Sequence, residues 1–192
     1  MNEKMKKALH QTLRPGETVR WESATQPFRI IDGREGRRTL IEWVISVLCI
    51  GAITVYFTAN GGGSARFYLI MAVLLAIFIL SPIFSYRELC GQYYLITQTR
   101  ALMLRADGSV YAMELRDMGE CRLYPLEFGG AALALGSTLL EEKDKQLRWR
   151  ACHPQESADA TGVNAVRGLV FYHVDRADEA MRLLNGCAAK EV

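Results

Sequence analysis

The hydrophobic and polar positions of the chain fall into three blocks, and the middle block is the most distinctive. Residues 39–86 hold two apolar runs, Leu40–Ala59 and Phe67–Ser85, separated by a glycine-rich connection. The first run carries one charged residue, Glu42, and the second carries none. A helix needs about 20 apolar residues to cross the roughly 30 Å of hydrocarbon in a bilayer. The pattern therefore predicts a transmembrane hairpin at residues 39–86.

The alternative for both runs is a pair of buried helices in a soluble protein. Neighbouring helices that are apolar on every face must be covered by protein on every face. A chain of 192 residues has only a small core in which to bury them. The membrane interpretation is therefore favoured over the soluble one.

Arginines lie on the side of the hairpin where the chain enters and leaves it. Four precede the first run and one follows the second, whereas the connection holds Arg66 alone. They are Arg29, Arg34, Arg37, Arg38 and Arg87. Loops rich in lysine and arginine stay on the cytoplasmic side of a membrane. We therefore expect a multi-pass protein of the inner (cytoplasmic) membrane with both termini in the cytoplasm.

Three of these arginines are candidate contacts for anionic lipid. Arg34, Arg37 and Arg38 directly precede the first span, where juxtamembrane cations are attracted to an anionic leaflet. Two interpretations remain open, because the same charges also set the orientation of the hairpin.

The N-terminal segment, residues 1–38, predicts a short amphipathic helix and one strand. Residues 2–13 place apolar side chains on one helical face, with lysines around them, and Pro15 and Gly16 end the pattern. This helix would lie either on anionic lipid or on the protein's own domain. A strand is predicted at Thr18–Trp21, and residues 22–38 are predicted to be irregular, with Gly33 and Gly36 as breakers.

The C-terminal segment, residues 87–192, predicts short antiparallel strands and one helix. Alternation of apolar and polar residues is clearest at residues 146–151, where Trp149 is expected to point inward. Residues 153–165 are predicted to form a loop, and a helix is expected after Asp175 and to end before Gly186. The seven predicted strands are 93–97, 100–105, 109–115, 120–126, 131–140, 146–151 and 167–174.

Two short motifs in these segments resemble the bacterial pleckstrin-homology-like (PH-like) domain family. Tyr94, Thr97 and Arg100 form a Tyr-x-x-Thr-x-x-Arg pattern, and residues 13–21 are similar to the Leu-x-x-Gly-Glu-x-Val-x-Trp lead of membrane-anchored members. Residues 168–184 resemble the closing strand and helix of the family. The resemblance implies an α+β protein: a two-helix transmembrane hairpin plus a cytoplasmic PH-like antiparallel seven-strand barrel closed by a C-terminal helix.

The resemblance carries over no catalytic residue. Some PH domains bind phosphoinositides through basic residues of the first two strands. Only Arg100 and Arg105 are basic there, with Asp107 beside them, so phosphoinositide binding at that place is not favoured.

Composition excludes several other functions. Residues 87–192 carry thirteen lysines and arginines against fifteen acidic residues, so this segment lacks the basic character of a nucleic-acid binder. Five single cysteines and three scattered histidines form no disulfide framework and no zinc motif. No catalytic residue, metal ligand or cofactor site is predicted, and the protein is not expected to be an enzyme.

The sequence thus predicts a membrane-anchored PH-like binding or scaffolding module on the cytoplasmic face. Its expected partners are the lipid bilayer and a protein partner or a second copy of the chain, and no nucleic acid. The alternative is a small transport or channel component that oligomerises through its hairpin. Ser46, Gly51 and Ala52 in the first span would permit close helix packing in that case.

Overall fold

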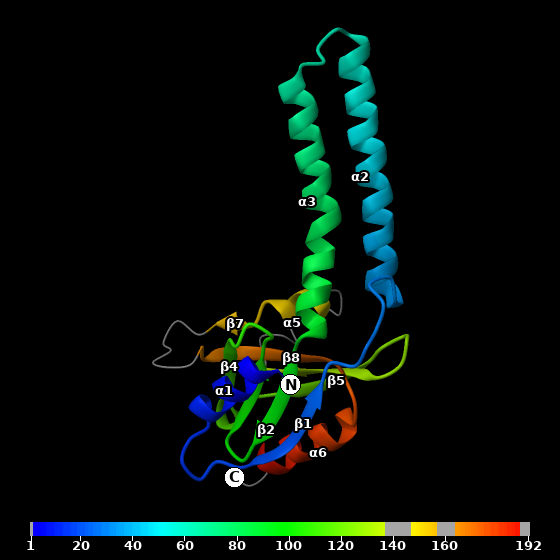
Figure 1. The fold of residues 1–192 in the computed structure, drawn as a ribbon. Coiled ribbons are helices and arrows are strands. Elements are labelled where there is room, and N and C mark those ends of the chain that lie inside the picture. Colours follow the sequence, from blue (N-terminus) through cyan, green and yellow to red (C-terminus); the bar gives the residue numbers. More distant parts are fainter. Residues whose placement is uncertain (1, 137–146, 157–163, 189–192) are drawn as a thin grey trace. The chain divides into compact units, whose positions relative to one another are not determined.

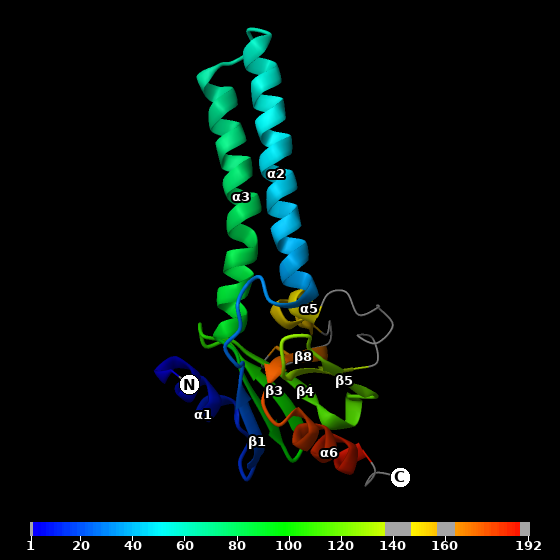
Figure 2. The same cartoon turned by 90° about the vertical axis from the view of Figure 1, so that its right-hand side faces the viewer.

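The computed structural model describes residues 2–136, 147–156 and 164–188 and has an α+β fold. The chain divides into two compact units (Figures 1 and 2). One is the helical hairpin, residues 28–87. The other combines residues 1–27 with residues 88–192, so the N-terminal segment folds together with the C-terminal segment. We call this second unit the folded domain.

The hairpin consists of two long helices, α2 (Gly33–Ala59) and α3 (Ala65–Cys90). At the connection, the hydroxyl groups of Thr58 and Tyr68 are hydrogen-bonded at 2.8 Å, and the rings of Phe57 and Phe67 lie 5.1 Å apart. At the other end, the Tyr86 hydroxyl donates to the Phe28 carbonyl oxygen at 2.7 Å. Side-chain contacts therefore join both ends of the hairpin.

Both helices are long and apolar enough to cross a membrane, by length and composition. No residue in the most apolar 18-residue window of either helix is buried in the structure. Among the described residues, all the exposed large apolar side chains except those of Val19 and Trp149 lie within residues 28–87. A buried helix pair in a soluble core would show the opposite pattern.

The start of α2 corrects one prediction. Residues 22–38 were expected to be irregular because glycine disfavours helices. Instead β1 continues to Ala24, and α2 begins at Gly33. Gly36 lies against the Ile31 backbone so closely that a Cβ atom would collide with it. Close packing of the preceding turn on the helix explains this glycine.

The folded domain contains two antiparallel sheets. The first sheet has the strand order β1 (Val19–Ala24), β2 (Tyr93–Thr97), β3 (Arg100–Leu104) and β4 (Val110–Glu114). A 3₁₀ turn, η1 (Leu115–Asp117), follows β4. The strands of the second sheet are β5 (Cys121–Pro125), β6 (Ala131–Leu135), β8 (Val166–Val174) and the two-residue β7 (Gln155–Glu156), in that order.

Isolated contacts link the two sheets, and two of them involve only the backbone. Ala112 of β4 bridges to Ala165, and its N–H donates to the Asn164 carbonyl oxygen at 3.1 Å. The Gln26 N–H, beyond β1, donates to the His173 carbonyl oxygen at 2.8 Å. Neither place is a continuous ladder. The α+β class is confirmed, and the described strands form two sheets without a closed barrel.

The first sheet packs against the second sheet on one face and against a helix on the other. The space between the sheets is filled by aromatic and aliphatic side chains, with Leu184 of α6 (Ala177–Ala188) among them. Met5 and Leu9 of α1 (Glu3–Thr12) are buried on the outer face, against Leu102 and Leu104. The first sheet is thus buried on both faces. Of the two alternatives for the N-terminal helix, the structure has the helix docked on its own domain.

Two further predictions for the C-terminal segment are wrong. Residues 147–152 form the short helix α5 (Leu147–Cys152) and not a strand, and the Trp149 residue is 50% exposed. The period-two alternation there came from arginines between apolar residues, and these residue types are also good helix formers. Gly186 lies within α6 and does not end it. The predicted strand positions 137–140 and most of the predicted loop lie outside the described residues.

Candidate functional site

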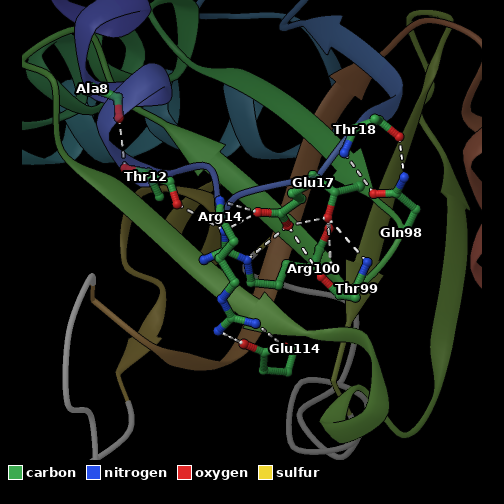
Figure 3. A network of polar contacts seen from close by, with 10 residues as sticks. Ala8, Thr12, Arg14, Glu17, Thr18, Gln98, Thr99, Arg100 and Glu114 are labelled. Carbon is green, nitrogen blue, oxygen red and sulfur yellow. Dashed lines mark hydrogen bonds and ion pairs between the residues drawn. The ribbon is translucent and has the colours of Figure 1, made fainter.

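An extended polar network among the described residues of the folded domain is centred on Glu17 and Arg100 (Figure 3). Glu17 lies in the turn between α1 and β1, and Arg100 is the first residue of β3. Their side chains form an ion pair in which they are only 4% and 5% exposed. An ion pair removed from water requires further hydrogen bonds to offset the loss of hydration.

Those hydrogen bonds come from three directions. The Thr97 hydroxyl donates to the Glu17 carboxylate at 2.7 Å, and the Arg14 backbone N–H donates to it at 2.9 Å. The Arg100 guanidinium donates to the Thr12 carbonyl oxygen at 3.0 Å as well as to the carboxylate. The pair therefore connects the end of α1 and the start of β1 with the β2–β3 turn.

The network shifts the pKa of the Glu17 carboxyl strongly. Burial by itself would raise this pKa, but hydrogen bonds from Arg100, Thr97 and the Arg14 N–H, together with the Arg100 charge, favour the ionised form. The balance lowers the pKa to about 2. At neutral pH the carboxylate is ionised and held in place.

Arg100 and Arg105, the basic residues of β3 and of the turn that follows it, both have partners within the domain. The Arg100 guanidinium forms the buried ion pair with the Glu17 carboxylate. The Arg105 guanidinium forms an ion pair with Glu88 at 2.8 Å, donates to the Cys152 carbonyl oxygen and lies 4.7 Å from the Tyr111 ring centre. These contacts give both cations structural partners, and the expectation that phosphoinositide binding there is not favoured remains a prediction.

A groove lies between the exposed edge of the first sheet and the beginning of α6. It has a volume of about 370 Å³. Trp21 lines it, is 3% exposed and stacks on Phe171, and its indole N–H has no hydrogen-bond partner in the described structure. The lining residues are Val19, Arg20, Trp21, Glu22, Arg176 and Glu179. The groove thus combines an edge strand, a buried donor and charges of both signs.

The three candidate lipid contacts lie together at the beginning of α2. Arg34, Arg37 and Arg38 are all exposed. Arg38 forms an ion pair with Glu42 at 2.8 Å, one helical turn further on. The three arginines therefore lie within the first two turns of α2, close to Glu42, the single acidic residue of the first apolar run.

Side chains that could support metal or nucleophilic chemistry lie apart. Within the described parts of the chain, no three His, Cys, Asp or Glu side chains gather as a metal site would require. Cys152 is buried, whereas the neighbouring His153 is exposed and stacks on Trp149. His173 is buried against Phe128. The predicted absence of catalytic, cofactor and metal residues remains a prediction.

Sequence reasoning did not find the ion pair or the groove. Glu17 lies in one of the two motifs that carry the PH-like resemblance, and Arg100 lies in the other. Their opposite charges were the available indication that the two residues pair. No local sequence pattern indicates the groove, because its two sides are about 150 residues apart in sequence. Comparison with protein-family models, curated proteins and solved structures finds no match to this chain.

A first prediction concerns the pH dependence of the folded domain. Because the pKa of Glu17 is depressed on folding, its contribution to stability is present above the unfolded value of 4.5 and is lost as the pH falls toward about 2. A difference of that size corresponds to roughly 3 kcal/mol. Glu17→Gln should destabilise the domain at pH 7, because Arg100 loses its buried partner. The loss should shrink between pH 4.5 and 2.

The measurement is urea unfolding of the full chain in detergent, followed by near-ultraviolet circular dichroism. Glu114→Gln is the matched control, since Glu114 pairs with Arg14 in an exposed position and should contribute less than about 1 kcal/mol. Equal stability of the two variants at pH 7 would contradict the assigned importance of the Glu17–Arg100 pair.

Proposed function

We propose that this chain is a membrane-anchored binding or scaffolding module on the cytoplasmic face of a bacterial inner membrane. The observation that carries the proposal is the pairing of an unburied apolar hairpin with a folded domain. The second apolar helix ends at Cys90, and the first strand after it begins at Tyr93. In a bilayer, the hairpin would hold that domain at the membrane surface.

The PH-like resemblance is supported by the way its motifs meet. Glu17 of the first motif and Thr97 and Arg100 of the second share one buried network. A motif whose members stabilise each other in space is a stronger signal than two separate short matches. We propose on this basis a PH-type core, in which the two sheets approach a seven-strand barrel with α6 across one end.

The groove beside β1 is the proposed binding surface of this module. β1 is the outer strand of its sheet, and an extended peptide can add to such an edge through main-chain hydrogen bonds. A protein partner or a second copy of this chain is the expected occupant.

The rival function is a transport or channel component built by hairpin oligomerisation. Between Leu40 and Ser85 the sequence has two charged residues, Glu42 and Arg66. Glu42 pairs with Arg38 at the beginning of the span, and Arg66 lies in the first turn of α3. A water-filled path through the bilayer requires polar groups along its length, so the binding module is preferred.

A second prediction tests the anchor and its orientation. In a variant without native cysteines, Ala65→Cys at the hairpin connection should be labelled from outside intact cells by an impermeant maleimide. Ala106→Cys, in an exposed turn of the folded domain, should be labelled only after the membrane is permeabilised. Both positions replace an exposed alanine, so reactivity is matched. Labelling of Ala106→Cys in intact cells would overturn the cytoplasmic assignment.

A third prediction concerns the groove. A benzophenone amino acid at Arg20 should give a discrete photocrosslinked species in native membranes, because Arg20 lines the groove. The same group at Arg122, an exposed position on β5, should not. An adduct of twice the chain mass would identify self-association through the folded domain. Absence of any adduct at Arg20, or the same adducts at both positions, would contradict the assignment of the groove.

A fourth prediction separates the two interpretations of the juxtamembrane arginines. If they bind anionic lipid, the triple variant Arg34→Gln, Arg37→Gln, Arg38→Gln should lose phosphatidylglycerol or cardiolipin in native mass spectrometry, at about 1 kcal/mol per charge. The control replaces Lys4, Lys6 and Lys7, three exposed cations of α1, by glutamine. Unchanged lipid retention in the arginine variant would leave these residues as orientation signals only.

A further inference from the structure

The outer face of β1 carries one cation and one anion, two positions apart. An irregularity between Val19 and Trp21 interrupts the pairing of β1 with β2. Side chains of residues 20–24 nevertheless alternate regularly between exposed and buried, with Arg20 and Glu22 both exposed. Residues two apart on a strand point to the same face of the sheet. Arg20 and Glu22 therefore lie side by side at the edge of the first sheet.

Both charged groups have hydrogen-bonding capacity left for a partner. Within the parts of the chain that the structure describes, the Arg20 guanidinium has no hydrogen bond and no ion pair. The Tyr93 hydroxyl donates to the Glu22 carboxylate. An ionised carboxylate has about four acceptor sites, so Glu22 can accept further hydrogen bonds.

The main chain of β1 is also open to a further strand. β1 is the outer strand of its sheet, and the Thr25 N–H continues its ladder with β2 by donating to the Gln92 carbonyl oxygen at 3.2 Å. In an antiparallel ladder, residues whose backbone groups bond the neighbouring strand alternate with residues whose groups point away from it. Counting back from Thr25 places the Glu22 N–H and C=O on the open edge.

We propose that β1 pairs antiparallel with β1 of a second copy of this chain, around a two-fold axis at Trp21. This inference rests on the proposed binding groove and names its occupant. In this register, Arg20 of each copy lies directly opposite Glu22 of the other. Directly opposite Cβ atoms are about 5 Å apart, which is close enough for an ion pair. The two-fold symmetry forms this ion pair twice.

Self-complementary charge favours a second copy over an unrelated peptide. In a two-fold interface the same patch meets itself, so a patch of one sign would repel its copy. The groove is lined by two cations and two anions, and Arg176 and Glu179 already pair with each other at 3.3 Å. Arg20 and Glu22 remain as the complementary charges between copies. An axis at Glu22 would instead place that carboxylate opposite its own copy, so charge selects the axis at Trp21.

The test exchanges the two charges in the full chain. Sedimentation equilibrium in density-matched detergent measures the dissociation constant of the dimer. Arg20→Glu and Glu22→Arg should each raise it about tenfold or more, because two attractive pairs become two repulsive ones. The double variant should restore the dimer, and so should an equimolar mixture of the two single variants, because each supplies the charge that the other lacks. Unfolding of a single variant would not be rescued by mixing.

Arg122→Glu is the control, because Arg122 is an exposed arginine of β5 in the second sheet, and it should leave the dissociation constant unchanged. A chain that stays monomeric, a dimer that the single variants leave intact, or a failure of rescue would overturn the proposal. The photocrosslink at Arg20 separates this result from the proposed function. An adduct of a mass other than twice the chain would overturn self-pairing alone, whereas the absence of any adduct would also overturn the groove.

Discussion

Charge removed from water is the constraint on which the folded domain depends. The Glu17 carboxylate and the Arg100 guanidinium are almost fully buried, so each is tolerable only while the other is present. Their hydrogen bonds involve the end of α1, the start of β1 and the β2–β3 turn. The pair therefore specifies how an N-terminal segment docks on a sheet whose other strands follow the hairpin.

The sequence predicted those parts of the fold that local pattern determines. The strand at Tyr93–Thr97 was predicted with its observed bounds, because a tight turn and apolar residues mark both ends. α5 was missed because Leu147, Trp149 and Ala151 alternate with polar residues as a strand would, although six residues also form a short helix. The two sheets meet through contacts between distant parts of the sequence, such as the Gln26–His173 hydrogen bond, which no local pattern encodes.

The candidate sites divide in the same way. Arg34, Arg37 and Arg38 could be selected from sequence because their position beside an apolar run carries the physical signal. The groove at Trp21 and the exposure of Trp149 could not be predicted from sequence. Both depend on which side chains are covered when distant parts of the chain pack together. Tryptophan is read as a core residue by default, and this chain uses one in the core and another at the surface.

The interleaving of the folded domain with the hairpin has a consequence for synthesis. Glu17 precedes Arg100 by 83 residues, and both apolar helices lie between them. Met5, Leu9 and Trp21 leave the ribosome before the strands that bury them exist. The domain can be completed only after the second apolar helix has been made. Its N-terminal segment therefore lacks these partners while both apolar helices are being synthesised.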